Sequence, residues 1–291
     1  MTAVLAPAAG DQPHFEPSAG RGAEIFEVLE VPNWAPWLRF SAEELEAQSE
    51  VFPAGQILVC DQESRPLASL STNRIDWDGV LEHLPTWDRV AGATRTYRET
   101  YAQNGNAIVL MSANVRRDAR KTRLTDLLID QIKRLAATEG IEHILSDFRP
   151  SEYGAYKLEA YKLEREGTGF AAYCALARQD GLPMDGWLRS LTRNGMQPLG
   201  VDSRAMVVRT TLEEFSRYRA TYHLDRWYRL TDPNVISIRM SEHTPHLDLD
   251  DVDEKWECRE TGTWYVDRSG GRALYVESNL WGRLPSTAPR H

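Results

Sequence analysis

The order of apolar patterns between residues 107 and 146 is the feature that most constrains the fold. Residues 107–112 form a continuous apolar run of strand length, and Ile141-Glu-His-Ile-Leu-Ser146 indicates a second strand. Between them, apolar residues recur at the spacing of one helix face until Gly140 supplies a helix stop, at Leu124, Leu127, Leu128, Ile132 and Leu135. A strand, a helix and a second strand in this order predict a right-handed parallel crossover, and therefore an α/β protein.

Two predicted hairpins add antiparallel strands to this unit. Residues 56–60 and 67–72 are joined by a turn-forming segment, and residues 262–266 and 273–277 flank Asp267-Arg-Ser-Gly-Gly271. Shorter apolar patterns predict further strands at residues 169–176 and 205–209. Helices are expected from Ser41 onward and over residues 151–166, 187–191 and 212–222.

These elements divide the chain into three predicted parts. Residues 1–22 are rich in Ala, Gly and Pro, and we expect them to be disordered. Residues 23–222 form the α/β domain, in which residues 73–104 lack a clean period and are interpreted as an irregular or helical insertion that walls a pocket. Residues 223–291 are interpreted as a β-rich C-terminal extension.

The composition narrows the class of protein. With 42% apolar and 26% charged residues the chain has the composition of a globular protein, and its formal net charge of −9 argues against a general nucleic-acid-binding surface. No run reaches the roughly 18 apolar residues that a membrane span needs. Three dispersed cysteines suit a reducing compartment, so we expect a cytoplasmic protein that does not span a membrane.

A cluster of basic residues stands where the predicted central helix begins. Arg116-Arg-Asp-Ala-Arg-Lys-Thr-Arg123 holds five basic residues in eight. The amino end of a helix is partly positive, so each cation there costs about 0.3–1 kcal/mol unless an anion is bound. A phosphate at this turn would accept hydrogen bonds from the free N–H groups and reverse that cost. The cluster therefore predicts an anion site, with a solvated basic turn as the alternative.

This order of elements resembles the GNAT acyltransferase superfamily over roughly residues 50–175. In that family a pyrophosphate loop follows the fourth strand. Its sequence pattern is Arg or Gln, then two residues, Gly, one residue, and Gly or Ala. Here Ala119-Arg-Lys-Thr-Arg-Leu124 aligns with the loop but lacks its glycines, so either the loop is wider or Arg120 supplies the missing charge. The resemblance implies a mixed, largely antiparallel twisted sheet flanked by helices. It also implies that acyl-coenzyme A is bound by Asn114, Val115, Arg120, Lys121, Thr122, Arg123, Leu124 and Thr125.

The resemblance also implies positions for catalytic groups. In the family a tyrosine on the helix after the fifth strand often protonates the leaving thiolate, and Tyr156 occupies the matching region, with Tyr161 and Tyr153 behind it. A phenol with a pKa near 10 is a suitable donor to a thiolate, whereas core packing is the alternative role for each tyrosine. Asp147 and Glu152 lie near the strand end, where a base would take the amine proton, with a solvated carboxylate as the alternative. Asp147 is included in the predicted site, and the base itself stays unassigned.

The activity implied is acyl transfer from acetyl-CoA or another acyl-CoA to the amine of a small specialised metabolite, in a biosynthetic role. A catalytically inactive GNAT-like ligand-binding or regulatory module is one alternative. A transferase that uses aminoacyl-tRNA as donor is another, and it is the one case in which we expect a nucleic acid as partner. The sequence leaves open whether two copies pair as a homodimer.

Two further groups of residues were considered for a site. Glu242-His-Thr-Pro-His246 with Cys258 contains metal-ligand residue types, but its spacing matches no strong zinc pattern, and we predict no metal. Near the C-terminus, acidic, amide and indole side chains either line a pocket for an amine or a sugar or cover a core, namely Glu277, Asn279, Trp256, Trp264 and Trp281.

Overall fold

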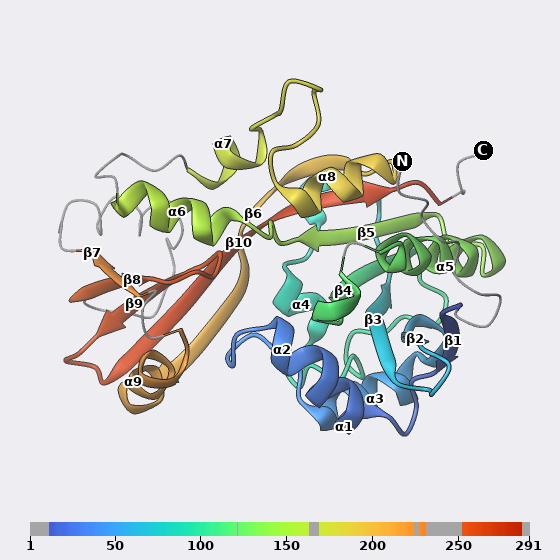
Figure 1. Cartoon of the computed structure of the whole chain (residues 1–291), viewed down its shortest axis with the longest axis horizontal. Coiled ribbons are helices and arrows are strands. Elements are labelled where there is room, and N and C mark those ends of the chain that lie inside the picture. The colour runs from blue at the N-terminus through green and yellow to red at the C-terminus, as the bar shows by residue number, and fades with distance from the viewer. Residues whose placement is uncertain (1–11, 121, 163–168, 224–226, 231–251, 287–291) are drawn as a thin grey trace, which may run out of the picture.

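A single sheet organises the chain in the computed structural model, which describes residues 12–120, 122–162, 169–223, 227–230 and 252–286 (Figure 1). Its order among these residues is β1-β2-β3-β4-β5-β10-β9-β8-β7, with β6 paired along β10. The strands are β1 His14–Pro17, β2 Ile57–Cys60, β3 Pro66–Ile75, β4 Ala107–Val115, β5 His143–Phe148, β6 Gln197–Thr211, β7 Tyr228–Leu230, β8 Glu254–Glu257, β9 Thr263–Asp267 and β10 Arg272–Leu284. Only β4 and β5 pair in parallel among the described strands, which confirms the predicted mixed, largely antiparallel sheet.

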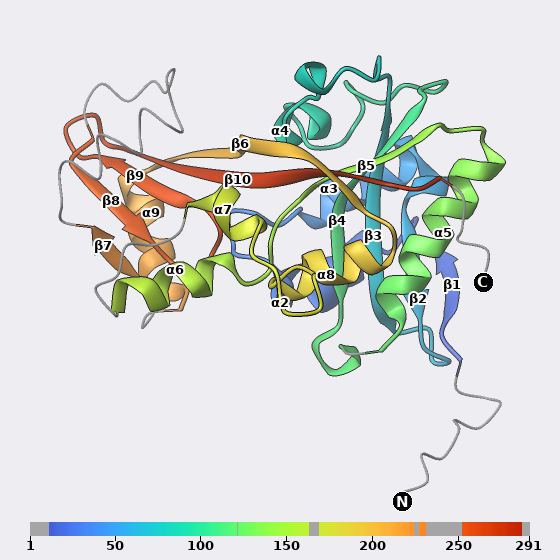
Figure 2. The same cartoon turned by 90° about the horizontal axis from the view of Figure 1, so that it is seen from above.

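Helices cover both faces of the sheet (Figures 1 and 2). Alternate residues of β4 face opposite ways, so Val109 and Met111 pack with α1, α3 and α4, whereas Ile108 and Leu110 pack with α5 and α8. The helical elements are α1 Gly22–Ile25, η1 Phe26–Glu30, α2 Val31–Asn33, α3 Ala42–Val51, η2 Pro53–Gly55, η3 Leu81–His83, α4 Trp87–Ala91, η4 Arg117–Ala119, α5 Leu124–Thr138, α6 Tyr153–Lys162, α7 Phe170–Cys174, α8 Gly186–Arg193 and α9 Leu212–Thr221. None of the helices in these ranges is long and apolar enough to cross a membrane.

The predicted crossover is confirmed. The apolar face of α5 packs on the sheet through side chains at helical spacing, such as Leu128 and Ile132, and Gly140 has the positive φ that a helix stop requires. The β2–β3 and β9–β10 hairpins are antiparallel, as predicted. At the start of α3, Ser41 accepts from the Glu44 N–H while Glu44 accepts from the Ser41 N–H, which confirms a helix beginning there.

The long strand β10 joins the two ends of the molecule (Figure 2). Residues 272–276 pair with β9, residues 280–284 pair with β5, and β6 follows the opposite edge of β10 along most of its length. The register shifts between Glu277 and Asn279, where β10 changes its neighbour. The segment interpreted as a C-terminal extension thus supplies a strand to the centre of the sheet.

Two local expectations differ from the structure, and a third cannot be compared with it. The strand prediction for residues 169–176 is wrong, because residues 170–174 form α7 and pack Phe170 and Tyr173 against Tyr153. Ordered structure begins before the predicted boundary at residue 22, since β1 pairs with β2 through residues 14–17. The acidic segment with Glu242 and His246 lies outside the described residues.

Candidate active site

The parallel strands β4 and β5 separate at their carboxyl ends. They pair only through residues 107–110 and 143–146, after which β4 stays on β3 and β5 stays on β10. The Ser146 hydroxyl donates to the Leu110 carbonyl at 2.9 Å where pairing ends. Beyond this point the separation leaves room for a pocket of about 80 Å³.

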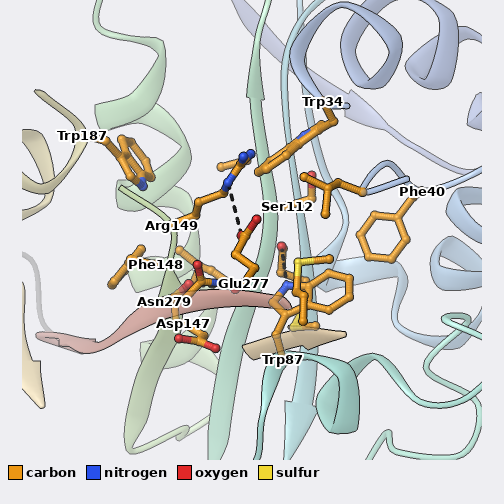
Figure 3. A pocket seen from close by; sticks show the side chains of 16 residues that line it. Trp34, Phe40, Trp87, Ser112, Asp147, Phe148, Arg149, Trp187, Glu277 and Asn279 are labelled. Carbon is orange, nitrogen blue, oxygen red and sulfur yellow. Dashed lines mark hydrogen bonds and ion pairs between the residues drawn. The ribbon is translucent and has the colours of Figure 1, made fainter. Parts of the chain in front are cut away.

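Residues from distant parts of the chain line this pocket (Figure 3). Its walls are mainly aromatic and aliphatic, and its polar groups come from β4, β5 and the register shift of β10. The lining residues are Trp34, Leu38, Phe40, Trp87, Leu110, Met111, Ser112, Ala113, Ser146, Asp147, Phe148, Arg149, Trp187, Met206, Glu277 and Asn279. Trp87, which lies in the predicted insertion at 73–104, is one of these lining residues.

A buried carboxylate holds the Trp34 wall in place. Glu30 accepts from the Ser112 hydroxyl at 2.8 Å and from the Asn114 amide at 2.7 Å, while the Asn114 carbonyl accepts from the Trp34 indole at 2.7 Å. Burial raises the pKa of Glu30, and these hydrogen bonds oppose the rise. The Asn114 side chain therefore positions the pocket wall, and only its backbone is left for the predicted contact with the donor.

Arg149 is the centre of an ion-pair network at one side of the pocket. Its Nε lies 3.2 Å from Glu277 Oε1 and donates to Thr261 Oγ1, its Nη2 donates to Glu260, and its guanidinium lies 5.3 Å from the Trp34 ring centroid. Burial alone would lower the pKa of Arg149, but Glu277 and Glu260 raise it overall. The network fixes Glu277 beside the cavity (Figure 3).

Asp147 is the buried carboxyl group that lines the pocket from β5. It is 4% exposed, no N–H or hydroxyl donor of the described residues reaches its oxygens, and it shares a hydrogen bond with the Asp202 carboxyl group. Burial raises its pKa well above the ordinary value, and the nearby carboxylates of Asp202, Glu277 and Asp88 raise it further. Such a group is a candidate proton acceptor, because a raised pKa brings a carboxylate closer to the basicity that proton transfer at neutral pH requires.

The acidic surroundings predict a pH-dependent stability. Burial raises the pKa of Asp88 to about 6 from 3.8, although the Val207 N–H donates to it. The folded state therefore holds this proton more tightly than the unfolded state, and stability is lost as the pH rises from about 4 through about 6. In the wild-type protein the free energy of unfolding should fall between pH 4 and pH 7, and Asp88→Asn should reduce that fall by up to about 3 kcal/mol. Urea unfolding at both pH values measures it. Asp76→Asn, at an exposed position, is the control; equal pH dependence in both variants would contradict the assignment.

The predicted donor loop joins β4 to α5. Arg120 donates to the side-chain carbonyl of Asn33 at 2.6 Å, and the Thr122 hydroxyl donates to the Ala119 backbone carbonyl. The Arg123 side chain is 88% exposed. Arg123 is the N-cap residue of α5 and makes no capping hydrogen bond with its side chain. The remaining predicted residues are placed differently: the Val115 carbonyl accepts from Asn33, Leu124 is buried in the core, Thr125 is half-buried in the first turn of α5, and Lys121 lies outside the described residues.

The predicted catalytic residues do not all meet in the pocket. Asp147 lines it, whereas Tyr156 packs against Tyr173 with ring centroids 5.0 Å apart and is not part of the lining. Tyr161 is in α6, but its side chain lies outside the described residues. The helix that carries both tyrosines packs on residues 257–262, where the Lys157 ammonium donates to Glu257 and to two carbonyl groups.

Sequence reasoning missed most of the aromatic and charged lining. Trp34, Phe40 and Arg149 were not assigned to the site, although Arg149 stands at the end of a predicted strand, where functional groups often gather. Of the C-terminal group considered for a pocket, Glu277 and Asn279 line it, whereas the Trp264 and Trp281 side chains belong to the core.

Comparison with solved structures defines the fold. The chain superposes on the loading GNATL domain of CurA from Lyngbya majuscula with a TM-score of 0.53 and 17% identity, covering 65% of this chain and 87% of that domain. The chain has the GNAT fold. Similarity is lower to the GphF GNAT-like decarboxylase in complex with isobutyryl-CoA, with a TM-score of 0.49, 18% identity and coverage of 66% and 90%. No protein-family model and no curated protein sequence matches the chain.

The GNAT fold was the expectation drawn from the sequence, and it is confirmed. A third similar structure is the diaminobutyrate acetyltransferase EctA from Paenibacillus lautus with L-2,4-diaminobutyric acid and coenzyme A, at a TM-score of 0.36, 10% identity and coverage of 67% and 83%. The superposition on the CurA domain defines the architecture alone, and the chemistry of the site must be argued from its own residues.

Proposed function

We propose that this protein is an N-acyltransferase that moves an acyl group from an acyl-CoA to the amine of a small specialised metabolite in the cytoplasm. The observation that carries the proposal is the position of Asp147, a buried carboxyl group next to Asp202 in the pocket where β4 and β5 separate. A thioester that reaches this separation from the α5 side would meet an acceptor amine beside Asp147.

The donor would be held by the turn between β4 and α5. Free N–H groups in the first turn of α5 and the helix dipole favour a pyrophosphate, and Arg120 and Arg123 add positive charge. The backbone of Asn114 and Val115 would then face the pantetheine arm. Lys121, Thr122, Leu124 and Thr125 complete the proposed contact, chiefly through their backbone groups.

The reaction would proceed by direct attack of the amine on the thioester carbonyl. Asp147 takes the proton that the acceptor nitrogen loses, the new C–N bond forms, the C–S bond breaks, and the thiolate of coenzyme A leaves with a proton from an acid. Tyr156 and Tyr161 on α6 remain the proposed acids. Their role requires α6 to bring a phenol within hydrogen-bond reach of the sulfur.

A double charge reversal tests the donor site. Arg120→Glu combined with Arg123→Glu should weaken acetyl-CoA binding on the order of 100-fold, because two charge-assisted hydrogen bonds of about 1.5–3 kcal/mol each are lost. Isothermal titration calorimetry measures the affinity, and thermal unfolding checks that the fold is intact. The control, Arg65→Glu with Arg98→Glu, makes the same charge change at two exposed surface ion pairs. Unchanged affinity in the first variant would reject this placement of the donor.

Two other functions give different results in the same assays. An inactive ligand-binding module would bind acetyl-CoA but release no free thiol with any amine. A transferase that uses aminoacyl-tRNA would bind its donor with a steep salt dependence set by several phosphates. Thiol release with acetyl-CoA and an amine separates the proposed function from both.

A further inference from the structure

A buried carboxyl group lines the pocket without an ion pair to any described residue. This group is Asp147 of β5, and the nearby carboxyl groups of Asp202 on β6 and Asp88 on α4, which are not part of the lining, raise its pKa. Neither of these two neighbours forms an ion pair with a described residue, and the described part of the chain has no group of three potential ligands that could hold a metal ion. A cation supplied by a ligand would stabilise the ionised form of Asp147, which burial and the neighbouring carboxyl groups disfavour.

The one arginine that lines the pocket is already occupied. Arg149 donates to Glu260 and Thr261 and pairs with Glu277, so its guanidinium group is already bound to protein carboxylates. A second arginine, Arg95, lies behind the wall, with its guanidinium 4.6 Å from the Phe40 ring centroid and donating to the Leu38 carbonyl. A carboxylate on a substrate would therefore meet carboxylates without gaining an arginine partner.

The rest of the lining suits an apolar body. Most of the other lining residues are aromatic or aliphatic, namely Trp34, Leu38, Phe40, Trp87, Met111, Phe148, Trp187 and Met206. Aromatic faces also attract an ammonium group, which adds to the effect of Asp147. The pocket thus combines apolar walls with one buried and unpaired acidic group.

From this combination, and resting on the proposed function, we infer that the acceptor is an apolar primary amine without a carboxylate next to its amino group. The class is that of decarboxylated amino acids, such as arylethylamines and branched alkylamines. An α-amino acid with the same side chain is excluded, because its carboxylate would be repelled by Asp147 and Asp202 and would find no free arginine among the described lining residues. A reaction that removes the carboxyl group from an amino acid would supply such a substrate.

Matched acceptors test this inference. With acetyl-CoA as donor, thiol release is measured for phenethylamine, phenylalanine and phenylalaninamide, and for isoamylamine, leucine and leucinamide. The amine should exceed the amino acid in kcat/KM on the order of 100-fold, because placing like charges together costs several kcal/mol. The amide, which has the bulk of the amino acid without its charge, should recover most of that factor. An amide as poor as the amino acid would point to size and overturn the inference.

A variant adds a second measurement. Asp202→Asn should lower the ratio of amine to amino acid about tenfold by removing one like charge, whereas the exposed control Asp76→Asn should leave it unchanged. Calorimetric binding of the same acceptors in the presence of desulfo-coenzyme A gives the preference without catalysis. Equal use of amine and amino acid overturns this inference alone. Absence of thiol release with every acceptor overturns the proposed function, and the calorimetric preference then still decides the inference.

Discussion

Replacing Asp147 by asparagine is expected to lower kcat/KM for amine acylation by about 10²- to 10⁴-fold, the contribution typical of one proton-transfer group. Asparagine has nearly the same shape but cannot accept the proton of the attacking amine. Acetyl-CoA affinity should not change, because the donor loop is on the other side of the separated strands. Thiol release under steady-state conditions measures the first quantity and calorimetry the second.

The pH dependence distinguishes a proton acceptor from a structural residue. Burial and neighbouring carboxylates raise the pKa of Asp147, so in the wild-type protein kcat/KM should rise with pH as this group loses its proton. Asp147→Asn should lack that rise, whereas the exposed control Asp180→Asn should keep it. An asparagine variant with wild-type kcat/KM, or with the same rise, would show that Asp147 takes no proton in the reaction.

Replacing Arg149 by methionine is expected to destabilise the protein by about 3–5 kcal/mol. The variant would leave Glu277 and Glu260 buried near each other without their shared cation, and a buried carboxylate without a partner is far more costly than an intact pair. Urea unfolding at pH 7 measures the free energy.

A double variant identifies the cause of that loss. Arg149→Met combined with Glu277→Gln removes the cation together with one of the stranded charges, so it should recover part of the stability that Arg149→Met loses. Arg189→Met, which removes an arginine that donates only to the Pro183 and Met184 carbonyls, is the matched control. A loss below about 1 kcal/mol for Arg149→Met, the range of a surface pair, would contradict the assignment.

The sequence predicted those parts of the fold in which neighbouring residues determine the structure. The helical spacing from Leu124 to Leu135 and the glycine at residue 140 give α5 its face and its end, and short apolar runs on both sides give β4 and β5. The β9–β10 hairpin follows from its turn residues. In α7 the same reasoning failed, because the apolar run at 169–176 suits a strand or a helix. Phe170 and Tyr173, three residues apart and buried on one side, were the signal for a helix.

The candidate site was less accessible to sequence reasoning, because its contacts join distant segments. Arg149 meets Glu260 across 111 positions, and the Trp34 indole meets Asn114 across 80. No local pattern predicts such pairs, since they depend on the register of β10 and on the path of η1 and α2 across the end of β4. Asp147 was included in the predicted site because it stands near the end of a predicted strand, and in the structure it lines the pocket.

The late position of β10 in the chain bears on how the protein is made. Residues 272–284 pair with β5, β6 and β9, and they bring Glu277 and Asn279 to the cavity. On the ribosome this edge of β5 must stay unpaired until residues 280–284 have been synthesised. The nascent protein would therefore form its donor loop well before its acceptor pocket, and an intermediate that lacks β10 would have no complete site.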